Sequence, residues 1–79
     1  MVAGVLITTE TRKTAAVYKA LKDLDGVANV TTVFGRFDIV AMIRALDLDA
    51  ASKLLEQIRS IDGVIASETL IASTPPRSN

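Results

Sequence analysis

The segment Gly35-Arg36-Phe37-Asp38 carries the residue types that most directly suggest ligand binding. A glycine in a turn lets backbone N–H groups point outward, where they can hold a carboxylate. The Asp38 carboxylate, three residues further on, could face an ammonium group. A ligand that carries both charges, such as an α-amino acid, would suit this pair. A hairpin turn has the same need for Gly and Asp, so a purely structural role stays open.

Two hydroxyl residues near the end of the chain could contribute to the same chemistry. Ser67 and Thr69 are two positions apart in an extended segment, so they share one face of a strand. Their hydroxyls could donate hydrogen bonds to a ligand, although solvated hydroxyls on an edge strand are the simpler interpretation. The predicted ligand-binding residues are therefore Gly35, Arg36, Phe37, Asp38, Ser67 and Thr69.

Other reactive groups have simpler explanations. Asp47 and Asp49 flank a predicted helix start, where they would cap the helix, and two carboxylates alone make a poor metal site. Tyr18, the only tyrosine, lies beside an apolar helical stripe and is expected to pack. The chain has no His and no Cys, so thiol and imidazole chemistry and a thiolate zinc site are excluded. We therefore expect no metal, no cofactor and no catalytic residue.

An internal repeat organises the elements that must position these residues. Asp25-Gly26-Val27 recurs as Asp62-Gly63-Val64 at an offset of 37 residues, since 63 minus 26 is 37. Each copy follows a stretch with apolar residues at helical spacing and precedes an extended stretch. Gly26 and Gly63 therefore lie just past two helix ends, where a positive φ is needed.

Four segments rich in β-branched residues surround the two helices: 2–9, 27–34, 38–45 and 64–72. The order strand, helix, strand, strand, helix, strand predicts an α+β fold, the ferredoxin-like βαββαβ plait of the dimeric α+β barrel type. We expect a four-stranded antiparallel sheet in the spatial order fourth, first, third, second, with both helices on one face. Residues 1–72 would form a single domain and 73–79 a flexible tail.

The two central strands are apolar on both sides, although helices can cover only one. A bare apolar face of several hundred Å² is rare on a soluble monomer. A chain of 79 residues without cysteine also gains stability from self-association. We therefore expect two subunits to pair through their sheets, and we predict an interface formed by Val5, Ile7, Ile39, Ala41 and Ile43.

Charge and hydropathy limit the partners. Nine Lys plus Arg residues balance nine Asp plus Glu residues, and there is no basic run. Direct binding to nucleic acid or to an anionic membrane is therefore not expected. No apolar stretch approaches the ~20 residues that span a bilayer, and the first residues lack the charged start of a signal peptide. We expect a cytoplasmic protein.

Several of these segments together resemble the ligand-binding domain of the Lrp/AsnC transcription regulators, known as the RAM domain. The segments that carry the resemblance are Leu6-Ile7-Thr8-Thr9, Leu24-Asp25-Gly26-Val27, Val33-Phe34-Gly35-Arg36-Phe37-Asp38-Ile39-Val40, Ile58-Arg59-Ser60-Ile61-Asp62-Gly63-Val64 and Ser67-Glu68-Thr69. The resemblance implies dimers that assemble into tetramers, octamers or decamers. It also implies a small effector, usually an amino acid, bound between dimers near Gly35 and Asp38, with hydroxyls at Ser67 and Thr69 of an adjoining subunit.

The chain begins with the first strand, so we expect a stand-alone RAM domain without the helix-turn-helix of these regulators. It would sense an amino acid and modulate transcription or amino-acid metabolism through partners. Two alternatives stay open. The chain could be an interaction subunit that joins full-length Lrp/AsnC regulators without sensing anything, or a small cofactor-less enzyme of the dimeric α+β barrel group.

Overall fold

The computed structural model describes residues 1–71, and the predicted tail lies outside this part of the chain. The elements are β1 (Val2–Thr9), α1 (Thr14–Lys22), β2 (Val27–Thr32), β3 (Ile39–Arg44), α2 (Leu48–Arg59) and β4 (Val64–Ile71). The strands form one antiparallel sheet in the order β2-β3-β1-β4. The predicted ferredoxin-like plait is confirmed. No helix within residues 1–71 is long and apolar enough to cross a membrane.

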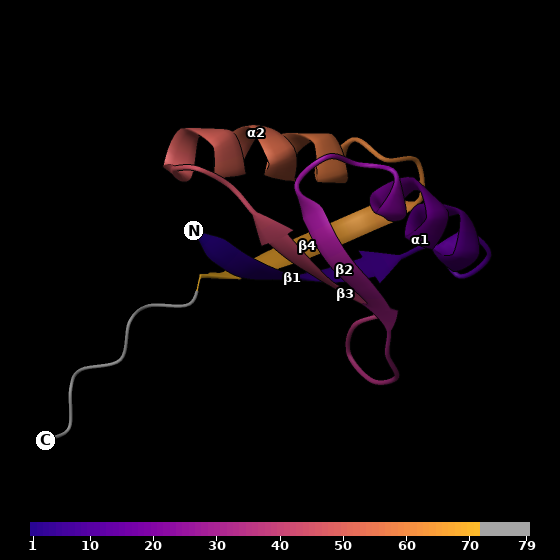
Figure 1. The fold of residues 1–79 in the computed structure, drawn as a ribbon. Helices are drawn as coiled ribbons and strands as arrows, with labels where there is room; N and C mark the ends of the chain where they lie inside the picture. The colour runs from indigo at the N-terminus through magenta and orange to yellow at the C-terminus, as the bar shows by residue number, and fades with distance from the viewer. Residues whose placement is uncertain (72–79) are drawn as a thin grey trace, which may run out of the picture.

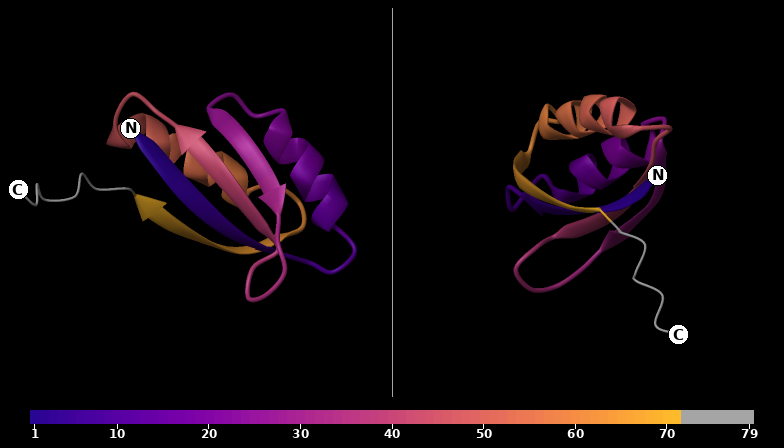
Figure 2. Two further views of the ribbon diagram at one scale, coloured as in Figure 1. Left: turned by 60° about the horizontal axis from the view of Figure 1, so that its bottom comes forward. Right: turned by 90° about the vertical axis from the view of Figure 1, so that its left-hand side faces the viewer.

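Both helices lie on one side of the curved sheet, and the other side carries no covering element in the described residues (Figures 1 and 2). The core fills the space between the helices and the sheet. It consists mainly of Val5, Ile7, Val17, Leu21, Ile39, Ile43 and Ile58, all of which are almost completely buried. Each such side chain contributes about 1.5–3 kcal/mol by leaving water.

The helix ends follow the local chemistry of the sequence. Asp47 caps α2, because its side chain accepts a hydrogen bond from the Ala50 backbone N–H at 2.8 Å. Gly26 and Gly63 follow α1 and α2 with φ angles of 93° and 104°. Both glycines have the predicted positive φ, but each lies four residues after the last residue of its helix, in the turn that leads to the next strand.

The structure corrects the predicted subunit interface. Val5, Ile7, Ile39, Ala41 and Ile43 point toward the helices and are at most 1% exposed, so no side chain among them can contact a second subunit. The predicted interface lies on the wrong side of the central strands. Both sides of these strands are apolar, so the alternation of residues did not show which side the helices cover. The opposite side of the sheet is named the open face below. By register its residues are Val2, Gly4, Leu6, Thr8, Asn29, Thr31, Val40, Met42, Arg44, Ala66, Glu68 and Leu70.

Candidate functional site

The Gly35–Asp38 segment lies in the loop between β2 and β3, at one end of the sheet (Figure 1). The Val33 N–H donates to the Asp38 carbonyl oxygen at 3.0 Å and closes the base of the loop. The Asp38 N–H donates to the Ile7 carbonyl oxygen at 2.9 Å, which continues the pairing of β3 with β1. The two ends of the loop are therefore held in place by backbone hydrogen bonds, and Asp38 is the last residue of the loop.

The Asp38 carboxylate is also held by the sheet. Its Oδ2 atom accepts a hydrogen bond from the Thr9 backbone N–H at 2.8 Å, in a half-buried position. This N–H belongs to the last residue of β1, where β3 no longer supplies a backbone carbonyl. No residue within 1–71 donates a hydrogen bond to Oδ1 of Asp38. The side chain is thus oriented by the fold and keeps one oxygen for another donor.

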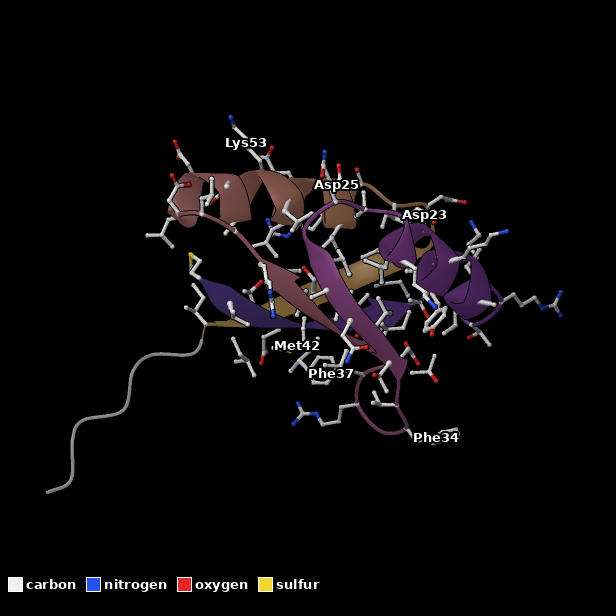
Figure 3. The ribbon with its side chains drawn as sticks, in the orientation of Figure 1. Asp23, Asp25, Phe34, Phe37, Met42 and Lys53 are labelled. Atoms are coloured by element: carbon white, nitrogen blue, oxygen red, sulfur yellow. The ribbon has the colours of Figure 1, made fainter. Side chains whose placement is uncertain are left out.

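The tip of the loop is open. Gly35 has a φ of 126°, and a Cβ atom added there would meet no other atom within 4 Å. Arg36 is exposed and Phe37 is half-buried. Figure 3 shows Phe34 pointing away from the domain and Phe37 turned back toward the sheet. A ligand or a second chain can therefore approach the turn without displacing other residues.

Ser67 and Thr69 do not join the turn within one chain. Ser67 lies opposite Ile7 and Thr69 lies opposite Val5, so both point toward the helix layer. The Ser67 hydroxyl accepts a hydrogen bond from Arg59 Nε at 3.3 Å. The Thr69 hydroxyl is buried and has no hydrogen-bond partner in the described residues. Ser67 is on β4 and Asp38 borders β3, with β1 between these strands, so about 10 Å separates the two strand axes.

Two parts of the site have no signal in the residue types. The Thr9 contact uses a backbone N–H, so nothing in its side chain marks it. The exposed apolar side chains of the open face also depend on which side of the sheet the helices cover. Met42 and Leu70 on the open face are 36% and 54% exposed. The turn itself is an open surface and not an enclosed pocket.

Chemically, the turn offers an oriented carboxylate and accessible backbone amides in a chain without His or Cys. Such groups bind charge and hydrogen-bonding atoms well. They supply neither a thiol nucleophile nor an imidazole base. The arrangement fits recognition of a ligand that has both an ammonium and a carboxylate group.

Comparisons with known proteins agree with this architecture. A family model described as the Lrp/AsnC ligand binding domain matches residues 2–78. TTHA0845 from Thermus thermophilus is 35% identical, with a TM-score of 0.87 over 96% of this chain and 98% of that one. PHS023, a hypothetical protein from Pyrococcus horikoshii, is 24% identical, with a TM-score of 0.84 over 96% of this chain and 94% of that one.

A longer protein shares the fold at lower identity. AsnC from E. coli is 22% identical, with a TM-score of 0.86 over 99% of this chain and 54% of that one. At this identity the likeness shows the fold alone. No match is found among curated proteins.

Proposed function

The chain belongs to the Lrp/AsnC ligand binding domain family, and from this premise we propose that it is an oligomeric regulatory domain that binds an α-amino acid and is not an enzyme. One observation carries the proposal. Asp38 is held by Thr9 at 2.8 Å beside a turn whose Gly35 has open space around it. In the proposed complex the Gly35 turn amides hold the ligand carboxylate, and the free Oδ1 of Asp38 accepts from its ammonium.

The binding site is completed by a neighbouring subunit. The open face supports pairing of two subunits, because Leu6, Val40 and Met42 on it are only partly shielded in one chain. Dimers then meet around the Gly35–Asp38 turn and enclose the ligand. Ser67 and Thr69 lie toward the helix layer of their own chain, so a role for their hydroxyls in this site requires a shift of Arg59 or of α2.

Ligand binding regulates by shifting the equilibrium between assemblies of dimers, such as tetramers, octamers or decamers. A ligand that binds one assembly and is present at 100 times its dissociation constant stabilises it by about 2.7 kcal/mol per site. Several equivalent sites multiply this effect. The proposal places the protein in the cytoplasm, where it acts on full-length regulators as partners. Its own zero net charge gives no electrostatic footprint for DNA.

Native mass spectrometry tests the proposal. The full chain is measured at several concentrations, with and without a pool of the twenty common amino acids. An oligomer built from dimers that gains the mass of one amino acid, or changes size with it, supports the proposal and identifies the effector. An oligomer that is indifferent to every amino acid favours the interaction subunit. A stable monomer contradicts the role given to the open face.

A further inference from the structure

The internal repeat places two similar local structures, each an Asp-Gly turn packed against a helix, at equivalent points of the fold. Asp62-Gly63 follows α2 and Asp25-Gly26 follows α1, and each glycine packs against the helix of the other half. A Cβ atom on Gly63 would lie 2.9 Å from Val17 Cγ2 of α1, and one on Gly26 would lie 2.8 Å from Leu54 Cδ2 of α2. Val17 and Leu54 are themselves 37 residues apart, as the repeat requires.

In the first of these structures a lysine fills the space above the glycine. Lys13 lies one helical turn before Val17, and its Cβ and Cδ atoms would be 2.7 and 3.1 Å from a Cβ atom on Gly63. Its Nζ atom is 3.1 Å from both carboxylate oxygens of Asp62 and 3.6 Å from Glu10 Oε2. An aliphatic stem thus covers the glycine, and its terminal ammonium pairs with the preceding aspartate.

In the second structure the lysine is missing. Ala50 stands at the equivalent position, 37 residues after Lys13 and one turn before Leu54. The surface there has a hollow of about 350 Å³, whose charged lining residues are Asp25, Arg44 and Lys53 and whose other walls include Gly26, Ala50 and Leu54. Asp25 forms no ion pair within residues 1–71, although the equivalent Asp62 is paired. The hollow therefore has the aspartate, the glycine and the apolar wall of the first structure, but Ala50 leaves the place of the Lys13 stem over the glycine unfilled.

We propose that this hollow binds a small molecule in which an aliphatic chain joins a primary ammonium to a carboxylate. The ammonium pairs with Asp25, and the chain lies over Gly26 against Leu54, as the Lys13 stem lies over Gly63. The carboxylate pairs with Lys53, which borders the same hollow and forms no ion pair within residues 1–71. Free lysine and straight-chain ω-amino acids have this chemistry. A diamine places a second cation beside Lys53 and binds more weakly.

This site is separate from the Gly35–Asp38 turn. The two lie at opposite ends of β2, a strand of six residues, and are about 20 Å apart. Figure 3 shows Asp25 beside the helix layer and Phe34 at the far end of the β2–β3 loop. The inference therefore goes beyond the proposed function and does not depend on it.

The test is an NMR titration of the full chain, in which backbone N–H shifts report the position of each probe. The probes are L-lysine, 6-aminohexanoate and 1,5-diaminopentane. We expect lysine and 6-aminohexanoate to shift the Gly26, Ala50 and Lys53 signals in a saturable way, and the diamine to bind several-fold more weakly. Absence of saturable shifts at these residues with lysine and 6-aminohexanoate overturns the proposal, whatever happens at the Gly35 turn.

Two variants sharpen the test. Ala50→Lys places a tethered lysine in the hollow and should abolish the shifts, whereas Ser52→Lys adds the same charge at an exposed position on α2 outside the hollow and should keep them. Asp25→Asn is a second variant that tests the proposal if Ala50→Lys fails to fold. It removes the negative charge and should weaken binding at least tenfold. Retained affinity in a folded Ala50→Lys or Asp25→Asn protein contradicts the proposal. Asp38→Asn should leave this binding unchanged, which separates the site from the proposed effector site.

Discussion

The Thr9 backbone N–H donates a hydrogen bond of 2.8 Å to Asp38 Oδ2 across 29 positions of the chain. The bond fixes the end of β1 to the start of β3, next to the loop that carries the candidate ligand site. The two interpretations of Asp38 that the sequence leaves open are therefore compatible. One oxygen has a structural role, and the other accepts no hydrogen bond from the described residues.

Asp38→Ala and Asp38→Asn should separate these two roles. Alanine leaves the half-buried Thr9 N–H without its acceptor, so we expect a loss of about 1–3 kcal/mol in the free energy of unfolding. Asparagine keeps an acceptor oxygen but removes the negative charge. It should retain most of the stability and lose the affinity for the amino acid. Urea unfolding and the mass-spectrometric binding assay measure the two quantities. An asparagine variant with wild-type affinity would argue against an ionic contact at Asp38.

A charge on the open face should dissociate the subunits. Met42→Glu places a carboxylate among apolar side chains that the proposed dimer buries, so we expect at least tenfold weaker association, about 1.4 kcal/mol or more. Sedimentation velocity at several concentrations measures the dissociation constant. Ser52→Glu adds the same charge at an exposed position on α2 and serves as the control. Equal dissociation constants for Met42→Glu and the wild type would exclude this face as the interface.

A substitution in the core should lower the stability of the fold without changing subunit association. Ile7→Val removes one methylene group from a side chain that is fully buried beneath the helices, so it should cost about 0.5–1.5 kcal/mol of stability. Because Ile7 lies on the helix-covered side of β1, subunit association should not change. Thermal unfolding and sedimentation measure the two effects, and weakened association in a folded variant would restore the interface first predicted from the sequence.

Gly63→Ala should destabilise the fold more than Gly35→Ala. Both glycines have positive φ, so alanine carries a backbone cost of about 1 kcal/mol at either position. At position 63 the new Cβ atom also meets Lys13 Cβ at 2.7 Å and Val17 Cγ2 at 2.9 Å, whereas at position 35 it meets nothing within 4 Å. Urea unfolding of the two variants compares them directly. Similar losses would mean that α1 can move away at little cost.

The Lys13 ion pairs should contribute to stability only below strongly alkaline pH. The hydrogen bond to Asp62, together with the charges of Asp62 and Glu10, raises the pKa of Lys13 above its ordinary value of 10.5. The folded protein therefore holds this proton more tightly than the unfolded chain. The contribution is complete below pH 10.5 and disappears as the pH rises through the raised pKa.

Lys13→Met isolates this effect, because methionine keeps an apolar stem over Gly63. The difference in unfolding free energy between the wild type and Lys13→Met should shrink as the pH rises past 10.5. Lys19→Met, at an exposed position without an ion pair in the described residues, is the control and should show no such trend. A difference that stays constant with pH would assign the stabilisation to the stem alone.

Much of the fold follows from local patterns in the sequence. Apolar residues at every second position predict strands, and apolar residues at helical spacing predict helices. Together these patterns predict the six elements, and the predicted first strand has the bounds of β1, Val2–Thr9. Gly26, Gly63 and Asp47 act within a few residues of their own positions, so their positive φ angles and the cap could be predicted. The position of the Gly35 turn was predictable for the same reason.

The tertiary structure alone decided which side of the sheet is covered. Alternation determines which residues share a face, but β1 and β3 are apolar on both faces, and the helices select one by their packing. The same choice turns Ser67 and Thr69 toward the helices and away from the turn. The Thr9–Asp38 bond and the unfilled place above Gly26 also join residues far apart in the chain. Such contacts exist only once the strands and helices have packed together, because no local pattern encodes them.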